Sequence, residues 1–308
     1  MARGISGIND SLGKKKIVLV GPSACGKTTF KKVFFEDANP IQLVKESLNP
    51  TRGLETDTYS AFSYLLSVWD LAGQEIDHWL GDRKDLFPDS AVIVCMMDAT
   101  APLKDSVSFL IRFLKVRRDM ASSMPIFLLL TKCDLVSNIQ AYNIILKIDN
   151  YVQEKYPEFA DECKRTNIQR ISVAEAFFLN TLTVAFRIIE VCIDKNELKV
   201  SSEYLAEIKS KMNLLSIFPP PASAVKISEL SIPGQLDSSK FQKYIDDLHS
   251  LGYLVRERNV FYSLSEKGSH FINACKKQAI LVKTKAMMEK ISFFFGLKAE
   301  MEKIGDKV

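Results

Sequence analysis

The chain has 308 residues, of which 47% are hydrophobic and 25% charged, and its formal net charge is +4. These totals are typical of a globular protein that is long enough for two hydrophobic cores. The six cysteines form no C-x-x-C pair, which argues against a disulfide frame and a zinc site. No run of 18 apolar residues occurs, which argues against a membrane span, and the flexible N-terminus predicted for 1–13 has no secretory core. We therefore expect a cytoplasmic protein.

The first functional motif is the stretch 21–29, GPSACGKTT, which follows the strand-like run 17–20. Gly, four residues and Gly-Lys-Thr form the phosphate-binding P-loop pattern, because glycine lets backbone N–H groups curl around phosphate oxygens. Lys27 can reach the β and γ phosphates, Thr28 can ligate Mg²⁺, and the helix predicted for 28–35 points its positive end at the anion. The Cys25 thiol is interpreted as a small tolerated side chain in preference to a redox-sensitive one. We expect the phosphates to contact Gly21, Ser23, Ala24, Cys25, Gly26, Lys27, Thr28 and Thr29.

A switch threonine is predicted at Thr51. The Pro50-Thr51 pair lies in a loop between the first helix and an alternating, strand-like run at 54–62. In this position Thr51 could touch Mg²⁺ only while a γ-phosphate is present.

The second switch follows a strand predicted for 64–69, which ends in the sequence DLAGQE. An aspartate at the end of a strand, followed by Gly-Gln, suits three roles: Asp70 holds the Mg²⁺ shell, the Gly73 amide meets the γ-phosphate, and Gln74 orients the attacking water. The predicted catalytic residues are therefore Gln74, Lys27 and Thr51, and the predicted metal ligands are Thr28, Thr51 and Asp70.

A base-binding site is predicted after the later strands. Strands at 91–97 and 126–130 flank a helix at 105–120, and Thr131-Lys132-Cys133-Asp134 follows the second of them. Asp134 can accept two hydrogen bonds from guanine N1 and N2, which adenine cannot offer, while Lys132 would lie along the base. Further on, 171–174 closes another strand, where a backbone amide of Ser172 or Val173 could meet guanine O6.

Strands alternating with helices predict an α/β fold with a mostly parallel sheet and the ligand at the carboxyl ends of its strands.

The ordered set GPSACGKT, PT, WDLAGQE and TKCD resembles the Ras-like small GTPases. PTRG and the WD pair look most like the Arf branch, and 82–100 is similar to the Rag/Gtr branch, whose members carry an extra C-terminal domain. The resemblance covers about 14–195, within a predicted GTPase domain of 14–197. It implies GTP and GDP as ligands, Mg²⁺ as cofactor, hydrolysis through Gln74, guanine specificity through Lys132 and Asp134, and exchange factors, GTPase-activating proteins and effectors as partners.

The sequence departs from the family pattern at three positions. Thr131 stands where the family usually has asparagine, so we expect the loss of an amide that ties the base loop to the phosphate loop. Ala72 stands where Arf and Rag proteins have glycine. Ala2 stands where myristoylation requires glycine, so no Arf-type lipid anchor is expected.

A second, smaller α+β domain of the winged-helix type is predicted for 218–275, after a connecting segment at 198–217 that contains an amphipathic helix. Its elements would be a short helix at 227–230, a turn at Pro233-Gly234, a helix at 238–251, a hairpin from 253–255 and 260–264, and a helix at 265–275. The 238–251 helix would present two lysines and two aspartates, so contact with protein is favoured over contact with nucleic acid.

The last segment, 276–308, carries the surplus of positive charge and is predicted to be a basic amphipathic helix, bent or broken at Gly296. Three alternatives are open for it: packing on the GTPase domain or a partner helix, which is favoured; peripheral contact with an anionic membrane through Phe293, Phe294 and Phe295; or a loose tail. Whether the chain pairs with another GTPase is also open.

These observations predict a Mg²⁺-dependent switch that binds and hydrolyses GTP and signals through protein partners. Two other functions are weighed against it. One is a nucleotide-gated DNA-binding regulator that acts through the winged helix, and the other is a scaffold that binds GTP without turnover.

Overall fold

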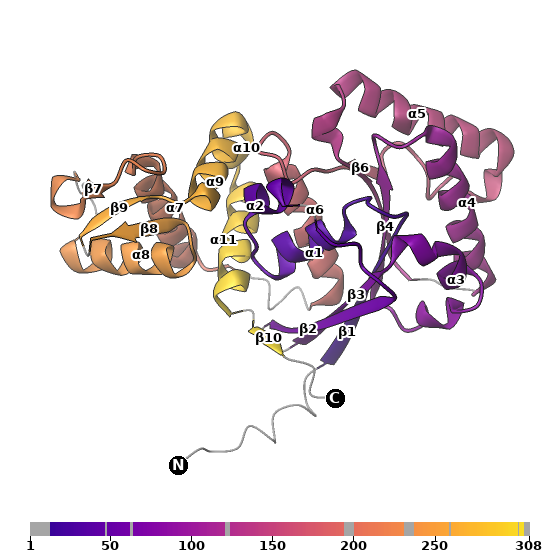
Figure 1. The fold of residues 1–308 in the computed structure, drawn as a ribbon, viewed down its shortest axis with the longest axis horizontal. Coiled ribbons are helices and arrows are strands. Elements are labelled where there is room, and N and C mark those ends of the chain that lie inside the picture. Colours follow the sequence, from indigo (N-terminus) through magenta and orange to yellow (C-terminus); the bar gives the residue numbers. More distant parts are fainter. Residues whose placement is uncertain are drawn as a thin grey trace, which may run out of the picture.

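The computed structural model describes residues 13–304, except for 47, 62–63, 121–123, 194–199, 231–236, 259 and 301. The flexible N-terminus predicted for 1–13 lies, apart from Gly13, outside the described residues. Figure 1 shows a larger lobe built on a twisted sheet and a smaller, mainly helical lobe beside it.

The central sheet has seven strands in the order β10-β2-β3-β1-β4-β5-β6. From β3 to β6 neighbouring strands are parallel, whereas β2 pairs antiparallel with β3, and the short β10 pairs antiparallel with β2 at the edge. The bounds are β1 Gly13–Val20, β2 Leu54–Ala61, β3 Tyr64–Leu71, β4 Val92–Asp98, β5 Ile126–Thr131, β6 Ile168–Arg170 and β10 Glu302–Ile304.

Helices cover both faces of this sheet (Figure 1). Successive β1 side chains alternate between two hydrophobic cores: Ile17 and Leu19 pack with α1 and α6, while Val18 and Val20 pack with α3 and α4. A central strand buried on both faces reads as a continuous apolar run, as it does here. These helices are α1 Lys27–Phe35, α2 Pro40–Lys45, α3 Ile76–Leu80, α4 Leu103–Asp119, α5 Asn138–Lys155 and α6 Phe178–Cys192.

Two local features were not predicted. Helix α2 lies in the first switch segment, where Asn39 caps the helix by accepting a hydrogen bond from the Ile41 amide and Pro40 occupies the first turn. Strand β6 ends at Arg170, so Ser172 and Val173 lie in the loop that follows it and not within the strand.

The smaller lobe contains α7 Ser202–Ile217, α8 Ser238–Ser250 and α9 Glu266–Lys277, with a three-stranded antiparallel sheet in the order β7-β9-β8. Its strands are β7 Val225–Lys226, β8 Leu254–Glu257 and β9 Phe261–Leu264. The helices and the hairpin lie close to their predicted ranges, and the predicted turn at Pro233-Gly234 lies outside the described residues. Membership of the winged-helix class stays a prediction.

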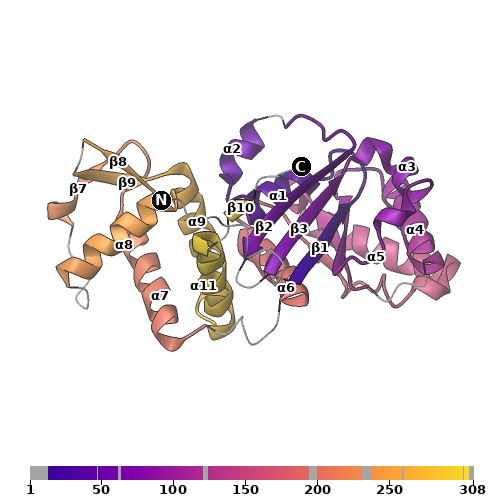
Figure 2. The same cartoon turned by 90° about the horizontal axis from the view of Figure 1, so that it is seen from below.

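The single helix predicted for 276–308 is wrong. Helix α9 ends at Lys277, the short α10 spans Ala279–Val282, α11 spans Lys285–Glu300, and the chain then forms the edge strand β10. Helix α11 continues through Gly296 without a break, because packing against α6 and α7 stabilises the helix beyond its intrinsic propensity. Figure 2 shows α11 lying between the two lobes.

Three consecutive phenylalanines of α11 are buried inside the protein. The exposed fractions of Phe293, Phe294 and Phe295 are 4%, 6% and 2%. Phe294 packs edge-on against Phe34 of α1, so the apolar face of α11 covers the larger lobe and is not available to a membrane. Among the described residues, no helix has the length and apolar character needed to cross a bilayer.

Candidate functional site

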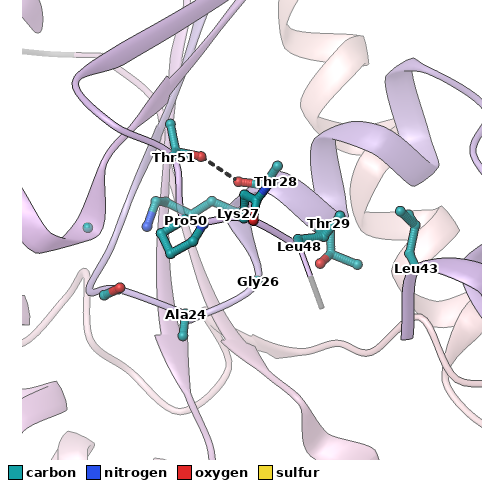
Figure 3. Close-up of a pocket in the computed structure, with 12 residues that line it drawn as sticks. Ala24, Gly26, Lys27, Thr28, Thr29, Leu43, Leu48, Pro50 and Thr51 are labelled. Atoms are coloured by element: carbon teal, nitrogen blue, oxygen red, sulfur yellow. Dashed lines mark hydrogen bonds between the residues drawn. The ribbon is translucent and has the colours of Figure 1, made fainter. Parts of the chain in front are cut away.

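The predicted phosphate loop connects β1 to α1 and wraps around a cavity of about 240 Å³ (Figure 3). Gly26 has φ +92°, a left-handed conformation that glycine adopts without strain. The Lys27 ammonium is buried under the loop, where its Nζ donates to the carbonyl oxygens of Gly21 and Pro22, each at 2.9 Å. The cavity is lined by Ser23, Ala24, Gly26, Lys27, Thr28, Thr29, Leu43, Leu48, Asn49, Pro50, Thr51 and Gly73. The loop therefore offers an anion a buried ammonium beside a helix N-terminus.

Two of the residues predicted to contact phosphate, Gly21 and Cys25, do not line this cavity. Gly21 contributes its carbonyl oxygen to the Lys27 ammonium, and the Cys25 side chain is fully buried. Burial raises the pKa of the Cys25 thiol, and the nearby Lys27 charge opposes this shift only in part. Cys25 is therefore a protonated, inaccessible thiol, in agreement with the preferred interpretation of a small packing side chain.

The three predicted metal ligands come together from three segments. Thr28 Oγ1 donates to Asp70 Oδ2 at 2.6 Å, and Thr51 Oγ1 lies 2.9 Å from Thr28 Oγ1 and 3.4 Å from Asp70 Oδ2. Figure 3 shows the hydroxyl groups of the two threonines pointing toward each other. Two hydroxyl groups and a carboxylate form an oxygen donor set of the kind that Mg²⁺ prefers.

The environment of Asp70 also fits a cation. The side chain is fully buried, and its Oδ1 has no hydrogen-bond partner within the described part of the chain. Burial raises the pKa of Asp70, although the hydrogen bond from Thr28 acts in the opposite direction. A buried carboxylate with an unpartnered oxygen is costly without a positive charge, and a divalent ion would supply that charge.

The second switch touches the phosphate loop through Gly73. A Cβ atom at this position would lie 2.3 Å from Pro22 C and Ser23 N, so only glycine allows this approach. The neighbouring Gln74 is exposed, with its Nε2 3.4 Å from the Thr51 carbonyl oxygen. Its amide group is therefore close to the switch threonine and open to solvent, as a residue that orients a water molecule must be.

The two switch segments are joined to each other by the backbone of Gly53. The Gly53 amide donates to Glu75 Oε1 at 2.9 Å, and the Gly53 carbonyl accepts from the Ala72 amide, also at 2.9 Å. Displacement of one segment will consequently disturb the other.

The predicted base-binding residues line a second cavity of about 220 Å³, which shares Gly26, Thr29 and Leu43 with the first. Asp134 Oδ1 accepts a hydrogen bond from the Ser172 hydroxyl, which fixes the carboxylate at the cavity. The Ser172 amide donates to Thr181 Oγ1 at 3.0 Å, whereas the Val173 N–H makes no hydrogen bond within the described residues. Val173 is thus the residue whose amide could meet an oxygen of a base.

Lys132 lies at the same cavity in a left-handed backbone conformation, with φ +55°. Its Nζ is 2.6 Å from Asp98 Oδ2. Burial acts to raise the pKa of Asp98, but hydrogen bonds from Lys132 and Thr100 outweigh it and hold the pKa below its ordinary value. The ion pair keeps the Lys132 side chain in place beside the base cavity.

The expectation that Thr131 loses the link between the base loop and the phosphate loop is wrong. Thr131 is buried, and its Oγ1 lies 2.8 Å from the Cys25 carbonyl oxygen of the phosphate loop and 2.9 Å from that of Met97. The hydroxyl has one proton to give to these two acceptors. A shorter side chain therefore makes the connection that the family usually makes with an asparagine amide.

A model of the Gtr1/RagA G-protein conserved region matches residues 16–218. The chain belongs to the Gtr1/RagA G-protein family. The match reaches past the end of the resemblance seen in the sequence and includes α6 and α7. It contains every residue assigned above to the phosphate, metal and base sites, and this Rag-like chain is thereby placed in the Ras superfamily of P-loop GTPase domains.

Curated relatives of this Gtr1/RagA-family chain are Rho-type proteins. GTP-binding protein rho1 of Schizosaccharomyces pombe is 27% identical over 186 residues, which cover 60% of this chain and 80% of that protein. Human Rho-related GTP-binding protein RhoB is 32% identical over 127 residues, 41% of this chain and 61% of RhoB. Human Rho-related GTP-binding protein RhoD is 36% identical over 90 residues, 28% of this chain, and the chain spans only 40% of the length of RhoD.

Sequence reasoning missed one wall of the site in this Gtr1/RagA-family protein. Leu43 of α2 lines both cavities, Val44 lines the second, and Leu48 and Asn49 line the first. Val44 is 71% exposed, so an apolar side chain lies open to solvent where it lines the second cavity. The Asn39-Pro40 helix start was the available signal, but it indicates a helix without showing what that helix faces.

Proposed function

We propose that this Gtr1/RagA-family protein is a molecular switch that binds GTP and GDP together with Mg²⁺ and hydrolyses GTP to GDP and phosphate. The observation that carries this proposal is the convergence of Thr28, Thr51 and Asp70 oxygens beside the phosphate loop. These residues come from α1, the first switch and the end of β3, and all three could ligate a divalent ion bound with the nucleotide.

The roles of the residues follow from their positions. Backbone amides of the phosphate loop and the Lys27 ammonium would bind the phosphates, with Lys27 exchanging its bonds to the loop carbonyls for bonds to phosphate oxygens. A bound Mg²⁺ ion would neutralise charge on the phosphate oxygens, held by Thr28, Thr51 and Asp70. Gln74, close to Thr51 and exposed to solvent, would orient the attacking water.

Guanine selection would rest on Asp134, whose carboxylate can accept both N–H groups of the guanine edge, and on the Val173 amide. Hydrolysis without a partner should be slow, on the order of 10⁻⁴ to 10⁻³ per second as in Ras-type sites. In the described part of the chain no arginine lines the phosphate cavity, so an activating protein that supplies one would accelerate the reaction.

Signalling would use the two linked switch segments. While the γ-phosphate is present, Thr51 and Gly73 are held at the loop, and the Gly53 bonds keep the segments together. After hydrolysis these contacts are lost, and exchange factors and effectors would distinguish the two states.

Nucleotide retention and single-turnover hydrolysis test this proposal. Purified protein should retain GDP or GTP in the presence of Mg²⁺ and not ATP, and Gln74→Leu should slow hydrolysis by about 10²-fold while leaving GTP binding intact. Gln242→Leu is the matched control, because Gln242 is exposed on α8. Equal retention of ATP would overturn the proposal, and a hydrolysis rate unchanged by Gln74→Leu would favour a GTP-binding scaffold.

A further inference from the structure

Helix α9 of the smaller lobe contacts two segments that line the nucleotide site. Figures 1 and 2 show it next to α2, beside the larger lobe. Its 12 residues span about 18 Å at 1.5 Å per residue. The contacting side chains recur at helical spacing along one side, Glu266, Lys267, His270, Asn273 and Lys277.

The first turn of α9 holds the segment that connects α1 to α2. Lys267 Nζ lies 2.6 Å from Asp37 Oδ2, and this pair is well shielded, with side-chain exposures of 13% and 28%. Glu266 forms a more exposed pair with Lys45 at the end of α2, at 2.8 Å. Helix α2 contributes Leu43 and Val44 to the nucleotide cavities, so these bonds restrain one wall of the site.

The middle of α9 holds the loop after β6, which contains Ser172 and Val173 of the base cavity. His270 is buried, and its Nε2 lies 2.8 Å from the carbonyl oxygen of Val173. Burial lowers the pKa of His270 more than this bond raises it, so the ring is neutral and donates through Nε2–H. The ring also meets Phe178 edge-on at 4.8 Å, which fixes its orientation.

The last turn of α9 holds the same loop two residues further on. Glu175 Oε1 accepts from Asn273 Nδ2 at 3.0 Å, and Glu175 Oε2 pairs with Lys277 Nζ at 2.7 Å. Gln278, just beyond the helix, donates to the Ala176 carbonyl oxygen. The loop that presents the Val173 amide is therefore fixed to the smaller lobe at three successive points.

We propose that α9 is an intramolecular clamp that positions both walls of the nucleotide site and slows the release of bound guanine nucleotide. This inference rests on the proposed function. Its side chains are positioning residues, since they contact the walls and not the ligand. A nucleotide enclosed between α2 and the loop after β6 can leave only when one of these walls moves, and α9 ties both walls to one rigid helix. Movement of the smaller lobe would then be coupled to nucleotide release.

Release of a fluorescent GDP analogue from the 308-residue chain, chased with excess GDP, tests the clamp. The variant Asn273→Ala/Lys277→Ala leaves Glu175 without its two α9 partners and should release the analogue about 3- to 10-fold faster, a change of the size expected for a few lost polar contacts. The matched control is Lys276→Ala on the same helix, because Lys276 is exposed and has no ion pair within the described residues; its release rate should equal that of the wild type.

Charge reversal and a second contact make the test specific. Glu175→Lys should also accelerate release, and adding Lys277→Glu should restore the slow rate, which a general effect of surface charge would not do. Asp37→Asn should also accelerate release, because it removes the charge that pairs with Lys267 at the other wall. Asparagine tolerates the left-handed φ of +57° at this position, so the backbone should be unchanged. Thermal melting of each variant confirms that it is folded.

The outcomes separate the two proposals. If the wild type retains guanine nucleotide while Asn273→Ala/Lys277→Ala, Glu175→Lys and Asp37→Asn all release it at the control rate, the clamp is overturned and the proposed function stands. If the wild type retains no guanine nucleotide, both are overturned.

Discussion

Lys298 offers a quantitative test of how α11 packs on the larger lobe. Its side chain is only 2% exposed, and its Nζ donates to the carbonyl oxygen of Val33 in α1 at 3.0 Å. Asp37 Oδ1 lies 3.7 Å away, while the Lys267 ammonium competes for the same carboxylate. Burial lowers the pKa of Lys298 to about 7, and the attraction of Asp37 only partly opposes this shift. We predict that Lys298→Met removes a pH-dependent contribution to the stability of the protein.

The sign follows from proton binding in the two states. In the unfolded chain Lys298 keeps its ordinary pKa of 10.5, so between about pH 7 and pH 10.5 the unfolded state binds one proton more than the folded state. The contribution of Lys298 to the free energy of unfolding therefore rises with pH across this window and is lost as pH falls towards 7. At 1.36 kcal/mol per pH unit, and with the folded state about half protonated at pH 7, the gain between about pH 7 and about pH 8.5 is roughly 2 kcal/mol.

Urea unfolding of the wild type and Lys298→Met at several pH values measures this gain. Groups far from position 298 titrate equally in both proteins, so the difference between the two free energies of unfolding reports Lys298 together with its neighbours Asp37 and Lys267. We expect the wild type to gain roughly 2 kcal/mol relative to the variant between about pH 7 and about pH 8.5. A difference that does not change with pH would show that Asp37 keeps Lys298 protonated, and the reasoning from burial would be refuted.

Two further predictions concern the base cavity. Asp134→Asn should weaken GDP binding by about 10²-fold or more, because an amide cannot accept both guanine N–H groups, and it should improve binding of a xanthine nucleotide. Competition titrations with the two nucleotides measure both effects, and an unchanged guanine preference would contradict the assignment. Thr131→Ala should raise the dissociation constant for GDP by about 5-fold, which corresponds to the roughly 1 kcal/mol of one buried hydrogen bond to the Cys25 carbonyl. Thr131→Ser keeps the hydroxyl and should bind GDP like the wild type in the same titration.

The sequence was sufficient for the parts of the site that lie in short contiguous motifs. A phosphate loop needs glycines, a lysine and a hydroxyl at fixed spacing, and an aspartate at the end of a strand lies where the ligand binds in a parallel sheet. Thr28, Thr51 and Asp70 could therefore be assigned before the fold was known, and the structure brings their oxygens together.

The same reasoning did not reach Thr131. The absence of asparagine indicated a lost connection, because a family pattern gives the usual side chain and not the distance that the side chain must span. In the structure β5 brings Thr131 close enough to the phosphate loop for a hydroxyl to bond the Cys25 carbonyl. The helix predicted for 276–308 was wrong for a related reason, since helical periodicity does not show where a chain leaves the helix to pair with an open sheet edge.

By itself the sequence determined the chemistry of the phosphate, metal and base contacts, because each depends on residue types held a few positions apart on one strand end or loop. Only the tertiary structure decided what covers the site: Leu43 and Val44 of α2, and α9 with its bonds to Asp37, Val173 and Glu175. An amphipathic pattern records that a helix has a buried face, but the surface that buries it is chosen by packing between segments far apart in the chain.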